Sequence, residues 1–112
     1  MILSSFSTIN IGNKCFNDLF LLNSISISGD RLIIRNQCFN NCYTLSFLAI
    51  LNFVETSIGC FSFNNLQKLS EIEFKNAYYI EINSNSFLKC HNIKKFAINF
   101  KDNSKVIIKP NL

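Results

Sequence analysis

Residues 38–50 read CFNNCYTLSFLAI, and variants of this stretch recur along the chain. Residues 15–27 read CFNDLFLLNSISI, residues 62–74 read SFNNLQKLSEIEF, and residues 86–98 read SFLKCHNIKKFAI. A unit of this size cannot enclose its own apolar face, so it must stack on copies of itself. The stretch therefore predicts a tandem-repeat solenoid. Its phenylalanine recurs at intervals of 23, 24 and 24 residues, at Phe16, Phe39, Phe63 and Phe87.

Five further positions of the repeat are apolar in every copy when the stretches are aligned on the phenylalanine. At an apolar background of 48%, chance filling of all six columns in four copies has a probability of roughly 10⁻⁸. The periodicity is therefore a property of the fold. The five columns are Ile11, Ile34, Ile58 and Ile82; Leu19, Cys42, Leu66 and Cys90; Leu22, Leu45, Leu69 and Ile93; Ile25, Leu48, Ile72 and Phe96; and Ile27, Ile50, Phe74 and Ile98.

Two segments of each unit have the alternation of a strand. The pattern L-x-x-I-x-I ends in two apolar residues on one side of a strand, and a second alternating pair, such as Leu32 with Ile34, precedes the phenylalanine. The third copy has Thr56 in that pair. The six residues between the phenylalanine and L-x-x-I-x-I suit a turn of helix or 3₁₀. We expect an α/β-type repeat solenoid, mostly β-strands with short turns or 3₁₀ segments.

These residues resemble the BspA-type leucine-rich repeat, whose unit reads roughly I-G-x-x-A-F-x-x-C-x-x-L-x-x-I-x-I. Ile11-Gly12 and Ile58-Gly59 match I-G, and residues 39–45 match F-x-x-C-x-x-L. The resemblance covers residues 9 to about 108 and implies a surface-displayed or secreted adhesion and recognition protein. The chain departs from the pattern by lacking the usual proline after the strand, by Arg35 and Asn83 in place of glycine, and by Cys15, Cys38, Ser62 and Ser86 in place of alanine.

A single leucine-rich-repeat domain over residues 1–112 is expected, because so short a solenoid has no internal boundary. The repeats are placed at about 9–31, 32–55, 56–79 and 80–105, with a partial fifth at 106–112. Neither end carries the polar cover that solenoid ends need. This predicts a fragment or minimal version of a larger array, and self-association through the uncapped ends.

The side chains that alternate with the core in L-x-x-I-x-I point outward and form the candidate partner-binding face. Repeat solenoids bind partners on such extended sheets. Phe47 and Leu51 form its apolar spot, typical of an interface anchor; the alternative is that they help cover a truncated array. The candidate residues are Ser26, Phe47, Ala49, Leu51, Glu71, Glu73, Lys75, Lys95 and Ala97.

Catalytic and metal-binding residues are not predicted. Glu71 and Glu73 lie about 7 Å apart on one strand, but we interpret them as solvated acids beside Lys95. His91, the single histidine, is expected in a solvated turn without an acidic partner. Cysteine and histidine do not recur in the paired spacings of a zinc site. No cofactor is expected.

The five cysteines make an odd number, which favours reduced thiols over a disulfide framework. Cys42 and Cys90 replace leucine in an inward column and are expected to be small buried hydrophobes. Cys15 and Cys38 are neighbours in adjacent units, so a bridge between them is the alternative. Cys60 is expected to be the exposed thiol.

Charge is unevenly distributed. Residues 89–112 contain six lysines against Asp102, whereas residues 1–88 contain five basic and six acidic side chains. Without an arginine-rich or aromatic-interleaved element, this basic end does not predict nucleic-acid binding. The longest apolar run, 47–51, is too short to span a membrane. The first residues lack a secretory signal, which predicts a cytoplasmic chain as written; the resemblance implies a surface or secreted location for a fragment.

The sequence therefore predicts a non-enzymatic protein-binding module with a protein partner of unknown identity. The alternative is a degenerate remnant that keeps the fold and has no retained partner.

Overall fold

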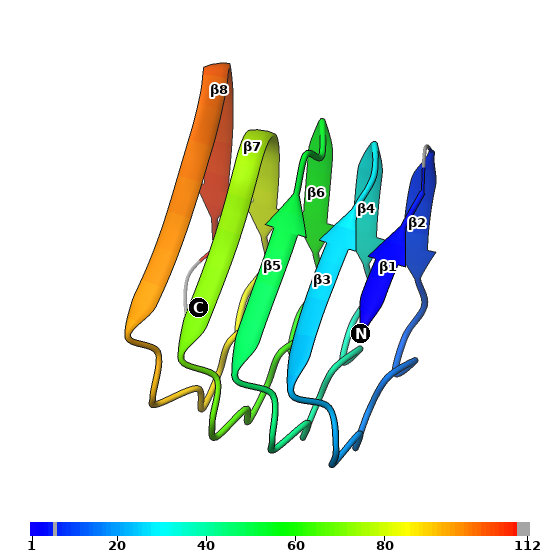
Figure 1. Ribbon diagram of the computed structural model, residues 1–112, viewed down its shortest axis with the longest axis vertical. Helices are drawn as coiled ribbons and strands as arrows, with labels where there is room; N and C mark the ends of the chain where they lie inside the picture. The colour runs from blue at the N-terminus through cyan, green and yellow to red at the C-terminus, as the bar shows by residue number, and fades with distance from the viewer. Residues whose placement is uncertain (6, 110–112) are drawn as a thin grey trace.

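Each repeat contributes two strands to a solenoid of parallel strands (Figure 1). The computed structural model describes residues 1–5 and 7–109, and these contain no helix. The prediction of a strand-rich repeat solenoid is confirmed. The strands are β1 (Ile2–Ser4), β2 (Thr8–Ile11), β3 (Ser24–Ser28), β4 (Arg31–Ile34), β5 (Phe47–Leu51), β6 (Glu55–Ile58), β7 (Glu71–Ile82) and β8 (Lys95–Ile108).

The strands form two layers that enclose the core. The first layer contains β1, β3, β5 and the first parts of β7 and β8; the second contains β2, β4, β6 and the last parts of β7 and β8. Because β7 runs through both layers, the strands join in one sheet of order β1-β3-β5-β7-β6-β4-β2, with β8 beside β7. Figure 1 shows the first layer in front of the second.

The pairing register agrees with the repeat alignment. Ser26 pairs with Ala49, Ala49 with Glu73, and Glu73 with Ala97. Every one of these pairs joins equivalent positions of consecutive repeats. The sequence period therefore becomes a ladder in which each side chain contacts its counterparts one rung away.

The apolar columns form the core. Phe39 and Phe63 are fully buried, and the four repeat phenylalanines stack with ring centroids 5.2, 5.1 and 5.2 Å apart. Thr56 takes its place in the core at 2% exposure. The columns are less well covered in the outermost rungs, where Leu19 and Phe96 are both exposed.

The segments around the phenylalanines form turns, and the helical alternative is not adopted. Each loop has a residue two before and a residue two after the phenylalanine at φ between 57° and 62°, the left-handed region. A right-handed helical turn cannot include such residues. Asparagine and aspartate tolerate this conformation best. The residues are Lys14, Asp18, Gln37, Asn41, Phe61, Asn65, Asn85 and Lys89.

The serine and cysteine residues that stand in place of alanine, directly before the phenylalanine, link consecutive rungs by hydrogen bonds. The hydroxyl of Ser62 shares its one proton between the carbonyl oxygens of Arg35, one rung earlier, and Gly59, which lie 2.7 and 2.8 Å from Oγ. The thiol of Cys38 likewise shares its one proton between the carbonyl oxygens of Gly12 and Arg35, at 2.9 and 3.0 Å. An alanine has no donor for these carbonyls. Serine and cysteine thus supply turn hydrogen bonds that the usual residue cannot make.

Two features differ from the expected repeat boundaries. Strand β1 precedes the first predicted strand and pairs with residues 26–28 of β3. Three residues are too few to show an alternation, so only the pairing identifies this strand. At the other end, residues 106–108, the expected start of a partial fifth repeat, complete β8. Residues 110–112, the end of the expected partial repeat, lie outside the described residues.

Candidate protein-binding surface

The nine predicted partner-binding residues lie in adjacent rows on the outer side of the first layer. We name this surface the front face and define it as the outward side chains of β3, β5 and the first parts of β7 and β8. One row joins Phe47, Glu71 and Lys95, and another joins Leu51 and Lys75. The third row contains Ser26, Ala49, Glu73 and Ala97.

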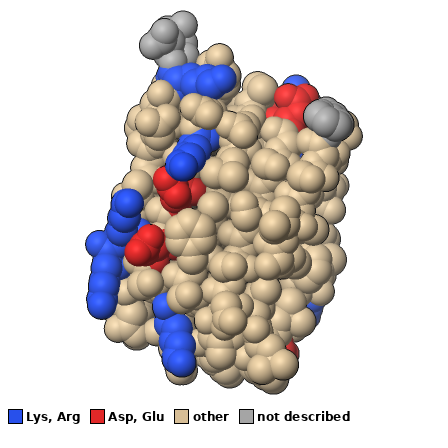
Figure 2. Space-filling view, viewed as in Figure 1, with Lys and Arg blue, Asp and Glu red and all other residues tan. Residues whose placement is uncertain are grey.

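The front face has an uncharged half and a charged half. The outward residues of β3 and β5 carry no charge, whereas those of β7 and β8 include two glutamates and two lysines. Figure 2 shows the charged side chains gathered over β7 and β8, toward the left of the view. The Lys75 Nζ lies 3.5 Å from a Glu73 carboxylate oxygen on the same strand. Lys95, the cation expected beside these glutamates, is the register neighbour of Glu71.

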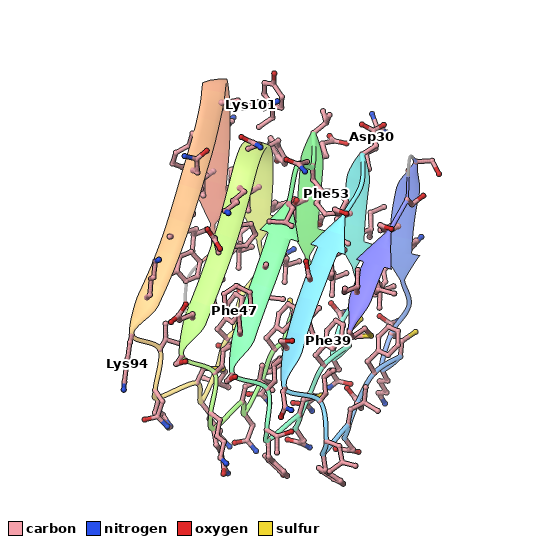
Figure 3. All side chains as sticks on the ribbon, viewed as in Figure 1. Asp30, Phe39, Phe47, Phe53, Lys94 and Lys101 are labelled. Carbon is pink, nitrogen blue, oxygen red and sulfur yellow. The ribbon has the colours of Figure 1, made fainter. Side chains whose placement is uncertain are left out.

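Phe47 and Leu51 are half-buried at the two ends of β5. Phe47 lies between Ser24 and Glu71 of the adjacent strands, and Figure 3 shows its ring on the first layer. Ala49, between them on the strand, retains only 5% exposure because its methyl group is shorter than the surrounding side chains. Ala49 is thus the floor of the face and the two larger side chains are its apolar contacts.

All five thiols are free in the structure. The Cys90 thiol donates to the carbonyl of Phe63 at 2.9 Å, and that of Cys42 donates to Phe16 at 3.2 Å. Burial raises the pKa of Cys38 and Cys90 from 9.0 to about 11, and it also raises the pKa of Cys42. A raised pKa keeps these thiols protonated, so they act as donors and not as nucleophiles.

The exposed thiol is Cys15, and the expectation of Cys60 was wrong. Cys60 is half-buried because its loop lies between those of two neighbouring rungs, and its backbone N–H donates a hydrogen bond to Asn36 Oδ1 at 2.9 Å. Cys15 lies on the first loop of the structure. Cys38, at the equivalent position of the next repeat, is buried, so exposure in the column of Cys15 is decided by position in the stack, which residue type does not reveal.

His91 lies exposed in a turn, as predicted. Among the described residues, no group of three or more histidine, cysteine, aspartate or glutamate side chains could hold a metal ion. The same residues include no helix long and apolar enough to cross a membrane.

Sequence reasoning considered only the front face. The second layer has an outward face of its own, which alternates with Leu32 and Ile34 in β4 and with Thr56 and Ile58 in β6. The alternation of residues in β4 and β6 could have predicted this second outward face from the sequence. Its significance depends on side-chain sizes in neighbouring strands, and these can be compared only once the register is known.

A protein-family model described as "BspA type Leucine rich repeat region (6 copies)" matches residues 9–109. This match covers nearly the whole chain and includes every strand from β2 to β8 except the first residue of β2. Comparison with curated proteins and with solved structures found no match.

Proposed function

Because the chain belongs to the BspA-type leucine-rich repeat family, we propose that it is a non-enzymatic protein-binding module that recognises its partner through the front face. In this proposal residues 1–112 act as one domain. The supporting observation is the one-to-one register of β3, β5, β7 and β8, which aligns outward side chains in rows across four strands. Repeat solenoids use such rows as extended binding surfaces.

A rigid scaffold favours this role. The phenylalanine stack and the hydrogen bonds of Ser62 and Cys38 connect each rung to its neighbours. A surface that is already ordered loses little conformational entropy on binding, so more of the contact energy appears as affinity.

The face also indicates the chemistry of the partner. Phe47 and Leu51 offer an apolar contact, whereas Glu71 and Lys95 offer opposite charges in one row. Aromatic side chains at the centre of an interface commonly supply most of its binding energy, and surrounding charges select the partner. We infer a folded protein partner with an apolar patch bordered by both kinds of charge.

We also propose that this binding serves adhesion or recognition at a cell surface, as in a surface-antigen-like protein. Support comes from the family resemblance. The free thiols, by contrast, favour a reducing compartment over a surface or secreted location. Fractionation of the source cells, with antibody against this chain, decides between these locations: recovery in the surface or secreted fraction supports the proposal, and recovery in the cytoplasm contradicts it.

Site-specific photo-crosslinking tests the front face. A benzoylphenylalanine replaces Phe47 in one variant and Tyr43, another half-buried aromatic residue outside the face, in a control. We expect a partner protein to crosslink through position 47 and not through position 43. Absence of any crosslinked protein at position 47 supports the alternative of a remnant without a partner.

The captured partner then allows a quantitative test. Phe47→Ser and Glu73→Arg are each expected to weaken its affinity at least about tenfold, the effect of losing an interface anchor or reversing a charge. Lys68→Ala, at an exposed loop position, is the matched control. Wild-type affinity in both front-face variants, with unchanged thermal stability, would falsify the assignment of this surface.

A further inference from the structure

The four loops that lead from the second layer to the first lie side by side along one edge of the stack, at the lower end of the strands in Figure 1. We name this surface the loop edge; it consists of residues 12–23, 35–46, 59–70 and 83–94. Near the end of the first loop, the Leu22 N–H donates to the Leu19 carbonyl at 3.4 Å and closes a tight turn. Equivalent turns follow in the other loops. Their central residues are Phe20 and Leu21, Tyr43 and Thr44, Gln67 and Lys68, and His91 and Asn92.

The turn centres of the first loop expose apolar side chains. Leu21 is 92% exposed and Phe20 is 53% exposed. Gln67 and Lys68, at the same positions of the third loop, are exposed although that loop has a neighbour on each side. The outward direction is therefore a property of the turn, and the position of the first loop in the stack does not cause it. We name Phe20 and Leu21 the apolar tip.

The second loop supports the apolar tip. The ring of Tyr43 stacks on that of Phe20, with centroids 5.6 Å apart and planes 10° from parallel. The Thr44 hydroxyl shares its one proton between the carbonyl oxygens of Phe20 and Leu22, each 2.8 Å from Oγ1. These carbonyls flank Leu21. A hydrogen-bonded polar group costs less to transfer from water to an apolar phase than an unpaired one, so the tip is suited to such a transfer.

The loop edge holds the whole net charge of the chain. Its four loops contain five of the eleven basic side chains and one of the seven acidic side chains, Asp18, which gives the same +4 as the complete sequence. All five cations are exposed, and among the described side chains no ion pair includes them. The five are Lys14, Arg35, Lys68, Lys89 and Lys94. The loop edge therefore attracts an anionic surface.

Apolar and cationic side chains divide the loop edge along the stack. Lys68 has the turn position of Leu21 two loops further on, and Lys89 and Lys94 lie in the fourth loop. At about 4.8 Å per rung, the first and fourth loops are roughly 14 Å apart, so one flat surface contacts all four. A protein buries a projecting side chain only where it has a matching hollow, whereas the interface of a lipid bilayer accepts one anywhere. An anionic bilayer supplies both the charge and the apolar phase.

We propose that the loop edge docks on an anionic lipid bilayer. Phe20 and Leu21 enter the boundary between headgroups and acyl chains, and the loop cations contact the headgroups. Tyr43 suits the same boundary because its ring is apolar and its hydroxyl is polar. Docking through this edge leaves the front face accessible, so the proposal does not depend on the function proposed above.

Co-sedimentation with phospholipid vesicles tests the proposal. Vesicles of phosphatidylcholine alone are compared with vesicles of phosphatidylcholine and phosphatidylserine, and a sample without vesicles corrects for self-associated protein. We expect the partition coefficient to be at least about tenfold higher for the phosphatidylserine vesicles, because the loop cations are attracted to an anionic surface. Absence of sedimentation with these vesicles overturns the proposal and favours an acidic protein as the partner of this edge. Equal sedimentation with both kinds of vesicle also overturns it.

A pair of serine variants tests the apolar tip. Leu21→Ser removes its most exposed side chain and should lower the partition coefficient at least about fivefold, because less apolar surface leaves water. Val54→Ser is the matched control, since Val54 is 46% exposed between β5 and β6, at the opposite edge of the stack. We expect unchanged binding there. Unchanged binding of Leu21→Ser contradicts insertion of the tip.

Two double variants with the same net charge locate the electrostatic contact. Figure 3 shows Lys94 at the loop edge and Lys101 toward the opposite edge. Lys89→Glu with Lys94→Glu should weaken binding at least about tenfold, whereas Lys101→Glu with Lys105→Glu should weaken it less than about threefold. Circular dichroism confirms folding. Equal losses in the two double variants assign binding to overall charge and overturn the assignment of the loop edge.

Discussion

The ring of Phe39 lies on the ring of Phe63, with centroids 5.1 Å apart and planes 5° from parallel. Both side chains are fully buried and occupy the same position in consecutive repeats. The spacing of the rings is close to the spacing of adjacent strands, about 4.8 Å. The backbone ladder therefore sets the ring separation, and the rings fill the space beside the sheet at every rung.

Phe63→Ala is expected to destabilise the protein by about 3–5 kcal/mol, because it leaves a cavity and removes contacts with two neighbouring rings. Phe16→Ala should cost less, since Phe16 is half-buried and stacks on one repeat phenylalanine. Urea unfolding followed by circular dichroism measures both. Equal losses in the two variants would contradict the role of the central stack.

Ser62→Ala should cost about 1 kcal/mol, because the carbonyls of Arg35 and Gly59 lose the hydroxyl proton that they share. Ser62→Cys retains a donor, as Cys38 does at the equivalent position, and is expected to cost less than the alanine variant. Urea unfolding of the two variants checks this order. A cysteine variant less stable than the alanine variant would show that side-chain volume, and not hydrogen bonding, selects this residue.

Stability should fall as pH rises from 9 to 11. The thiols of Cys38, which is buried, and Cys90, which is half-buried, have pKa values near 11 in the folded protein against 9.0 ordinarily. The unfolded chain therefore loses these protons first, and the thiols' contribution, complete below pH 9, disappears as pH passes 11. Urea unfolding at several pH values measures the slope. A variant with Cys38→Ser and Cys90→Leu should show a shallower slope; an identical slope refutes this origin.

Gly59→Ala should destabilise the protein by about 1–3 kcal/mol, because its Cβ would lie 2.8 Å from the Arg35 carbonyl carbon and backbone atoms of the preceding rung must move. Gly12→Ala is the control: its added methyl group meets only the Cys15 sulfur, at 3.2 Å, within 4 Å. We expect a change within about 0.5 kcal/mol there. Thermal unfolding distinguishes the two, and a neutral Gly59→Ala would show that the rungs can separate locally.

Concentration-dependent self-association stays a prediction. Ile2, in the first rung, is 81% exposed, and Phe100, in the last, is 51% exposed. Apolar side chains beside an unpaired strand edge favour pairing with another chain. Light scattering over a range of concentrations should show association, reduced by Ile2→Lys with Phe100→Lys. A monomer of the unsubstituted protein at high concentration argues against it.

The repeat period predicted the fold because it carries its own register. Once Phe39 and Phe63 occupy equivalent positions, the remaining columns follow by counting, and the rows of the front face follow with them. The repeat period did not predict strand β1, because β1 lies before the first complete unit. The repeat period did not predict the turn conformation either, because a spacing of three residues also suits a helical turn. The left-handed backbone at Asn41 and Asn65 is visible only in the structure.

The order of residues alone was enough for the layered stack, its buried columns and the composition of the front face, since each depends on a local period repeated along the chain. Three-dimensional packing was needed for the loop edge, the exposure of Cys15 and the hydrogen bonds of Ser62 and Cys38. Each of these depends on residues about one repeat apart in the sequence, and such residues become neighbours only when the rungs stack. Local patterns specify the rung; contacts between rungs specify its surface.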